Sequence, residues 1–133
     1  MTMKKFLKIL IVEEEQDDID LIKRALQKAD FLFETRVADC EEGFLSELRK
    51  FSPDVILSDH SLPQFNSIEA LRICQKEGLR IPFILVTGSV SDEFAAISIK
   101  SGVSDYVLKS DLKRLPSVIS KSLGESESQK NVK

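Results

Sequence analysis

The stretch KILIVEEEQDD, residues 8–18, passes without a break from aliphatic side chains into acid. The four aliphatic residues at positions 9–12 are typical of a strand that is covered on both faces in a parallel sheet. Five of the next six residues carry carboxylates. Because like charges this close repel one another, the end of the predicted strand needs a cation to neutralise it.

Apolar runs of strand length alternate with segments of helical spacing along the chain. After residue 12, Asp17 or Asp18 is placed to cap a helix whose apolar residues repeat from Ile19 to Ala29. Five such βα units predict an α/β fold, an open doubly wound parallel sheet with helices on both faces, and they are too few for an eightfold barrel. The expected strands cover residues 8–12, 34–38, 54–58, 82–88 and 105–109, and the later helices cover residues 41–50, 67–78, 92–100 and 115–123.

Length and composition predict one globular domain. The 133 residues suit a single core, which we expect to span residues 1–123, with 124–133 a polar tail or the start of a linker. A net charge of −3 gives no basic field for nucleic acid or a membrane surface, and no apolar run is long enough to cross a bilayer. Cys40 and Cys74 lack metal-ligand spacing, and we expect reduced thiols in a cytoplasmic protein.

Chemically active side chains follow four of the five predicted strands. Glu13 and Glu14 follow the first strand, Asp59 follows the third, Thr87 ends the fourth, and Lys109 ends the fifth. In an open parallel sheet the carboxyl ends of the strands form one edge, and ligands bind outside that edge. We therefore expect the three acids, the hydroxyl and the ammonium to converge on one small patch.

Three carboxylates in one pocket are costly unless cations join them. Lys109 supplies one positive charge, and Mg²⁺, which prefers oxygen ligands, would supply the rest. Glu13, Glu14 and Asp59 are therefore candidate magnesium ligands. Beside a metal, a lysine and the hydroxyl of Thr87, the Asp59 carboxylate can attack phosphorus and form an aspartyl phosphate. The remaining acids are expected to form a solvated loop and helix cap; they are Glu15, Asp17 and Asp18.

This set of residues resembles the receiver domain of two-component response regulators, over roughly residues 6–123. The resemblance rests on the acid pair after the first strand, on VILSDHSLP around Asp59, on ILVTGS around Thr87, and on DYVLK, which holds Tyr106 and Lys109. It implies a flavodoxin-like fold and transfer of a phosphoryl group to Asp59 from a histidine kinase or a histidine phosphotransfer protein. It also implies slow self-catalysed dephosphorylation.

The resemblance further implies a conformational switch. Thr87 would move toward the phosphoryl group, and the ring of Tyr106 would fill the vacated space. That movement would re-shape the face formed by the predicted helix 92–100, strand 105–109 and helix 115–123. The face would bind a downstream protein and is a candidate surface for a homodimer.

Two serines gain expected roles through the same resemblance. Ser61, two residues past the acceptor, and Ser89, two residues past the switch threonine, are expected to tune the lifetime of the phosphoryl group. Ser61 is also expected to offer its backbone carbonyl to the metal.

The chain departs from the family pattern at three positions. Glu14 stands where the family has aspartate, and the extra methylene moves its oxygens by about 1.5 Å. Because Mg²⁺ tolerates geometric error poorly, this change predicts weaker Mg²⁺ binding. Ser110 replaces a proline that commonly follows the lysine. Ser67 stands where glycine is common, and Asn66 is expected to take a left-handed conformation instead.

Three other functions fit part of the pattern. A phosphohydrolase of the haloacid dehalogenase type needs a second acid two residues after Asp59, where this chain has Ser61. A nucleotide or flavin binder needs a glycine-rich loop after the first strand, and the first glycine is Gly43. A degenerate receiver that acts as an interaction module without phosphorylation stays open because of the double-glutamate pair. We therefore expect a signalling domain rather than an enzyme. Adjacent residues at the end of a strand point in different directions, so we expect the side chain of His60 to point away from that of Asp59.

Overall fold

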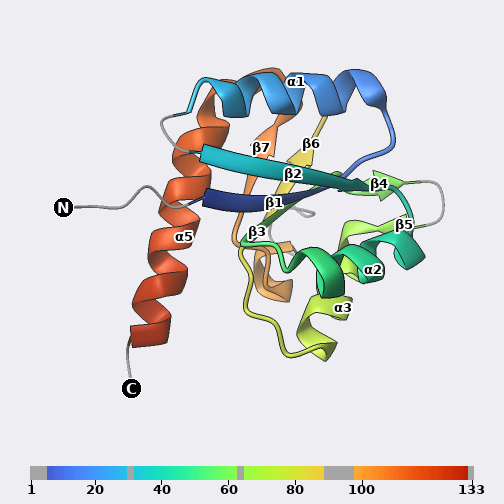
Figure 1. The fold of residues 1–133 in the computed structure, drawn as a ribbon, viewed down its shortest axis with the longest axis vertical. Helices are drawn as coiled ribbons and strands as arrows, with labels where there is room; N and C mark the ends of the chain where they lie inside the picture. Colours follow the sequence, from blue (N-terminus) through green and yellow to red (C-terminus); the bar gives the residue numbers. More distant parts are fainter. Residues whose placement is uncertain (1–5, 30–31, 63–64, 89–97, 132–133) are drawn as a thin grey trace.

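The computed structural model of the chain describes residues 6–29, 32–62, 65–88 and 98–131. Its main sheet has five parallel strands in the order β2-β1-β3-β6-β7 (Figure 1). This order confirms the predicted open doubly wound sheet, and all five predicted strands are present. The strands are β1 Phe6–Val12, β2 Leu32–Ala38, β3 Val55–Ser58, β6 Phe83–Thr87 and β7 Asp105–Leu108.

Helices connect the strands, as the alternating pattern predicted. The long ones are α1 Gln16–Gln27, α2 Glu41–Phe51, α3 Ser67–Lys76 and α5 Leu115–Asn131. Residues 98–101 are also helical, whereas the rest of the helix predicted over residues 92–100 lies outside the described residues. Two short features were not predicted: an antiparallel hairpin of β4 Ser61–Leu62 with β5 Phe65–Asn66, and the 3-10 helix η1 Lys109–Arg114.

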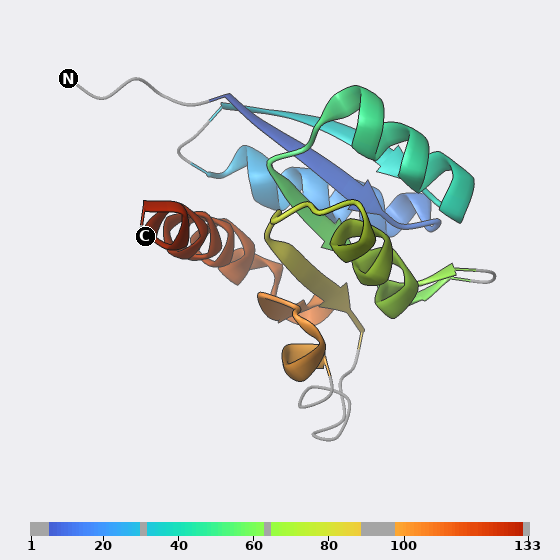
Figure 2. The ribbon, with the colours of Figure 1, turned by 90° about the horizontal axis from the view of Figure 1, so that it is seen from below.

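The sheet separates two hydrophobic cores. In β1, Ile9 and Ile11 belong to the core under α1 and α5, while Leu10 and Val12 belong to the core under α2 and α3. All four side chains are fully buried, which is why residues 9–12 of this strand are aliphatic at every position rather than at alternate ones. Figure 2 shows α2 and α3 lying across one face of the sheet, with α1 behind it.

Two residues that precede helices differ from the prediction, although α3 begins at Ser67 as predicted. The N-cap of α1 is Glu15 (φ −82°, ψ 116°), not Asp17 or Asp18. Asn66 does not take a left-handed conformation: it is extended (φ −107°, ψ 170°) and caps α3. Its side chain accepts a hydrogen bond from the backbone N–H of Glu69, whose carboxylate accepts one from the Asn66 N–H, each at 3.0 Å. This reciprocal pair satisfies two backbone donors and fixes the extended conformation.

The C-terminal helix runs farther than the sequence indicated. α5 continues to Asn131, past residue 123, because a single exposed glycine, Gly124, weakens a helix without ending it. The domain limit at residue 123 stays a prediction. Among the residues described, none of the helices is both long and apolar enough to cross a membrane.

Candidate functional site

The sheet itself positions the two central acids at its carboxyl edge. Val12 of β1 pairs with Ser58 of β3, so Glu13 and Asp59 come next on neighbouring strands. The backbone continues the ladder for one more step on each side: Asp59 N–H donates to Val12 O at 2.9 Å, and Glu13 N–H donates to Ala38 O at 3.1 Å. The predicted convergence of these acids is therefore confirmed by the register.

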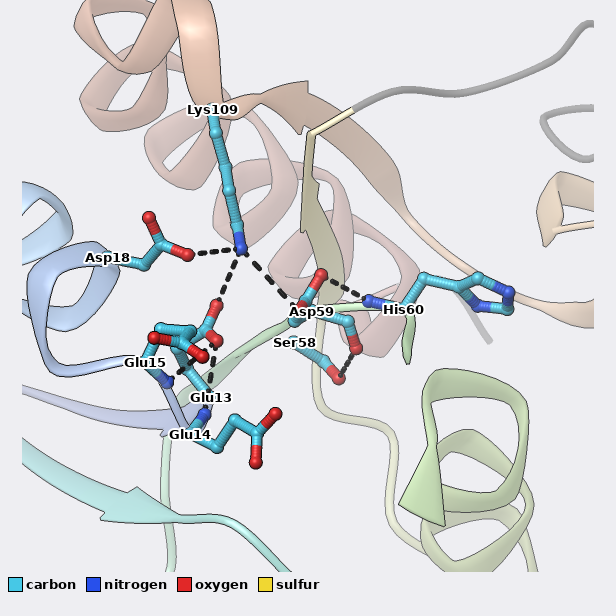
Figure 3. Close-up of polar contacts among 8 residues, drawn as sticks. All are labelled: Glu13, Glu14, Glu15, Asp18, Ser58, Asp59, His60 and Lys109. Carbon is cyan, nitrogen blue, oxygen red and sulfur yellow. Dashed lines mark hydrogen bonds and ion pairs between the residues drawn. The ribbon is translucent and has the colours of Figure 1, made fainter. Parts of the chain in front are cut away.

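The Lys109 ammonium lies among three carboxylates from three separate segments of the chain (Figure 3). Its Nζ is 2.7 Å from Asp18 Oδ2, 2.9 Å from Glu13 Oε1 and 3.5 Å from Asp59 Oδ2. The predicted association of Lys109 with Glu13 and Asp59 is thus present. Asp18 was expected to be a solvated cap, and this was wrong: because α1 starts at residue 16, Asp18 falls on its first turn and reaches into the site.

Glu13 is the most enclosed member of this group, with 1% of its side chain exposed. Its Oε2 accepts hydrogen bonds from the backbone N–H groups of Glu14 and Glu15, both at 3.1 Å. These bonds turn the carboxylate back over its own loop and hold Oε1 toward Lys109. Hydrogen bonds to an ionised carboxylate and a nearby ammonium together offset the cost of burying its charge.

The environment of Lys109 favours its charged form. Burial by itself would lower the pKa of this ammonium. The hydrogen bond to Asp18, the contact with Glu13 and the charge of Asp59 act in the opposite direction and outweigh burial. The pKa of Lys109 therefore lies above the ordinary lysine value, and the side chain is charged at any pH near neutrality.

Glu14, the second acid of the predicted metal pair, is placed differently. Its side chain is exposed, and Figure 3 shows its carboxylate apart from the three that surround Lys109. The backbone of Glu14 still contributes to the site through its hydrogen bond to Glu13. The sequence correctly put both residues at the edge of the sheet, but the structure joins only Glu13 to Lys109.

Asp59 is held by its immediate neighbours. Its Oδ1 accepts a hydrogen bond from the His60 N–H at 2.8 Å, and its other oxygen faces Lys109. The His60 imidazole is turned away, as expected, with Nδ1 2.9 Å from the hydroxyl of the buried Ser67. The Ser58 hydroxyl donates to Asp59 O at 2.9 Å. Asp59 thus presents a fixed carboxylate on a side chain that is 15% exposed.

Thr87 and Tyr106 lie on one face of the sheet, on adjacent strands. Val12, Ser58, Leu85 and Tyr106 form one row across four strands. Thr87 is two residues beyond Leu85 and therefore shares its face, and Leu85 and Tyr106 both pack into the core under α2 and α3. Thr87 is 6% exposed and ends β6 at the same edge as the acids.

Of the two serines expected to tune the phosphoryl lifetime, only Ser61 lies within the described residues. Ser61 begins β4, where it pairs with Asn66, and its backbone follows directly from Asp59 and His60. Ser89 lies outside the described residues. Ser110 is the second residue of η1, and the described backbone contains no cis peptide bond.

The acid group can accommodate Mg²⁺, although no three carboxylate, imidazole or thiol groups within the described residues form a ready metal cage. Besides its ion pair, buried Glu13 Oε1 accepts no hydrogen bond from the described residues, so it has lone pairs to offer a cation. Asp59 adds a second oxygen donor at the same edge. Because Mg²⁺ commonly takes one or two carboxylates and keeps several waters, this all-oxygen set fits it.

An acid-lined edge on a five-stranded doubly wound sheet places the chain in the flavodoxin-like class of α/β proteins. A family model described as the response regulator receiver domain matches residues 9–120. The chain therefore belongs to the response regulator receiver domain family, whose members are signalling domains.

Similar proteins agree with this assignment. The chain is 32% identical over 129 residues to the regulatory protein AtoC of Escherichia coli K12, covering 95% of this chain and 27% of that protein. It is 30% identical to the sensory transduction protein LytT of Bacillus anthracis, covering 96% of this chain and 51% of that protein. The chain thus spans about half, or less, of these relatives.

Solved structures show the same fold. A CheY-like receiver domain protein from Methanospirillum hungatei superimposes with a TM-score of 0.78 at 27% identity, covering 94% of this chain and 99% of that one. The signal receiver domain of a putative Luxo repressor protein from Vibrio parahaemolyticus gives a TM-score of 0.82 at 17% identity, covering 95% and 96%. The second likeness concerns the fold alone.

Proposed function

We propose that this domain is a phosphoacceptor switch in two-component signalling, with Asp59 as the acceptor. The observation that carries the proposal is the position of the Asp59 carboxylate: it is held by the His60 N–H and lies 3.5 Å from the Lys109 ammonium, next to buried Glu13. A positioned carboxylate beside a fixed cation is the arrangement that nucleophilic attack on phosphorus requires.

The transfer would proceed by in-line displacement. An Asp59 oxygen forms a bond to the phosphorus of a phosphohistidine while the phosphorus–nitrogen bond breaks, and the electron pair leaves with the imidazole. Lys109 screens the charge of the transferring group, and the Thr87 hydroxyl donates a hydrogen bond to a phosphoryl oxygen. Mg²⁺, bound by Glu13, Asp59 and the Ser61 carbonyl with a contribution from Glu14, would neutralise charge on the phosphoryl oxygens.

The partners follow from the same proposal. The donor is a histidine kinase or a histidine phosphotransfer protein of the cytoplasm. Movement of Thr87 and Tyr106 would change the face made by residues 98–101, β7 and α5, which would bind a downstream protein or a second copy of the chain. Ser61 and Ser89 would tune the phosphoryl lifetime.

Acetyl phosphate provides the direct test. Incubation with acetyl phosphate and Mg²⁺, followed by intact mass spectrometry, should reveal one labile phosphoryl adduct. The adduct should be absent in Asp59→Asn, which keeps the shape of the side chain, and greatly reduced when EDTA replaces Mg²⁺. An adduct that persists in Asp59→Asn would remove this residue from the acceptor role.

One observation favours a second candidate, a receiver that binds partners without being phosphorylated. The exposed Glu14 carboxylate stands apart from the group around Lys109. If Mg²⁺ binding fails for this reason, no adduct will form from acetyl phosphate in the wild-type protein. Restoration of the adduct by Glu14→Asp would identify the second acid as the cause.

A further inference from the structure

Asp18 makes the shortest contact in the site, yet the phosphoryl transfer proposed above gives it no role. Its Oδ2 is 2.7 Å from Lys109 Nζ, whereas Asp59 Oδ2 is 3.5 Å away, beyond the usual N–H···O range. The ammonium is thus bonded to Asp18 and only near Asp59. We propose that Asp18 is a positioning residue that retains Lys109 and competes with an incoming phosphoryl group for it. This inference rests on the proposed function.

The contact joins two firmly packed elements. Asp18 lies on the first turn of α1, and the next residue, Ile19, and Ile22 anchor that turn in the core with 5% and 2% exposure. Lys109 lies where β7 passes into η1, and Leu112 of η1 packs against the same core. Because both backbones are fixed by the same core, the pairing does not depend on a freely moving surface chain.

The donor count of lysine explains the competition. An ammonium has three N–H donors. Asp18 accepts one of these donors at 2.7 Å, and Glu13 Oε1 lies 2.9 Å away in an ion pair, so a phosphoryl oxygen must compete with both carboxylates for the ammonium. A bound phosphoryl group would also meet the negative charge of Asp18, which is 27% exposed and therefore only partly screened by water. Loss of that charge should release Lys109 toward the phosphoryl position.

The chain offers a matched control for this substitution. Asp17 is the neighbouring residue on the same helical turn and is exposed, so Asp17→Asn changes the net charge exactly as Asp18→Asn does without touching Lys109. Asn also keeps the size of the Asp side chain in both variants.

Binding of beryllofluoride, an anion that mimics a phosphoryl group on a carboxylate, provides the first measurement. With Mg²⁺ constant, the fluorescence of Tyr106, the single tyrosine in a chain without tryptophan, reports binding. Asp18→Asn should bind beryllofluoride several-fold more tightly than wild type, and Asp17→Asn should match wild type. On a Lys109→Met background, Asp18→Asn should bring a much smaller gain, because only the repulsion between Asp18 and the anion is then relieved. An equal gain there, or no gain beyond that of Asp17→Asn, would overturn the inference.

Urea unfolding without Mg²⁺ provides a second measurement that needs no phosphoryl chemistry. The midpoints of Asp18→Asn, Lys109→Met and the double variant should be non-additive, because the second substitution removes a contact already lost. Additive midpoints would refute the pairing. If wild type binds no beryllofluoride, the proposed function fails, and this cycle alone then decides whether Asp18 holds Lys109. The same curves show that each variant folds.

Discussion

Lys109→Met removes the ammonium that pairs with three carboxylates, and the metal-free fold should lose stability. Removing one member of a fully buried ion pair costs about 3–5 kcal/mol, because the other charge is left buried. Here Glu13 is 1% exposed, but Lys109 and Asp18 are 20% and 27% exposed, and Glu13 keeps its two backbone hydrogen bonds. We therefore expect a loss of about 2–3 kcal/mol in the free energy of unfolding.

Urea denaturation followed by circular dichroism in EDTA at pH 7 measures this loss. For a domain of this size the expected cost corresponds to a midpoint lower by about 1–2 M urea. Lys76→Met, an exposed lysine on α3, is the control and should change the free energy of unfolding by less than about 0.5 kcal/mol. Saturating Mg²⁺ should reduce the cost, because a dication replaces part of the missing charge.

The contribution of Lys109 to the free energy of unfolding should change with pH in one direction. The pKa of Lys109 is raised in the folded state, so its contribution is complete below the unfolded lysine pKa of about 10.4 and is lost as pH rises through the higher folded pKa. The difference between wild type and Lys109→Met should therefore be constant from pH 7 to about pH 9 and shrink only above about pH 10.4. Equal stability of the two proteins at pH 7 in EDTA would refute the reasoning.

Three further predictions concern other parts of the molecule. Glu14→Asp should bind Mg²⁺ more tightly than wild type in an isothermal titration, because the shorter side chain has the length that the family uses at this position. Burial raises the pKa of Cys74 to about 12, so iodoacetamide should modify exposed Cys40 alone in the folded protein, as counted by intact mass. Gly102→Ala should cost about 2 kcal/mol in urea unfolding, because φ is +117° and a Cβ would lie 2.9 Å from Gln75 Nε2.

A specific outcome would contradict each of these three predictions. Unchanged Mg²⁺ affinity in Glu14→Asp would show that side-chain length is not limiting. Modification of Cys74 at the rate of Cys40, before unfolding, would contradict its burial. Gly124→Ala is the control for the glycine variant: Gly124 lies in α5, an added Cβ would meet no side chain within 4 Å, and the variant should be neutral or slightly stabilising. Equal stability of the two glycine variants would argue against strain at Gly102.

The residues at the carboxyl edge of the sheet could be predicted because buried parallel strands have a distinctive sequence pattern. Aliphatic runs set the strands, and a doubly wound topology brings their carboxyl ends together, so Glu13, Asp59 and Lys109 followed from sequence order alone. Asp18 was missed because the start of α1 was placed two or three residues too late. With the helix starting at residue 16, Asp18 turns toward the sheet, and a shift of one or two residues at a helix end decides which face a side chain occupies.

Loop conformation was harder to predict, although one signal was present. Asn66 and Glu69 have the spacing of a capping box, which predicts an extended Asn66 rather than a left-handed one. The β4–β5 hairpin depends on a tertiary contact, since the ring of Phe65 packs 5.5 Å from that of Phe44 on α2. No local pattern specifies that pairing.

Because α5 is long, a small rotation at its first turns would move its far end by a larger distance. Its 17 residues extend about 25 Å, and Leu115, Val118 and Ile119 clamp its first turns in the core. Figure 1 shows its far end well away from the sheet. A tilt of only about 10° at the end packed in the core would displace the far end by roughly 4 Å. A small rearrangement beside the sheet would therefore produce a larger displacement at the C-terminal end of α5.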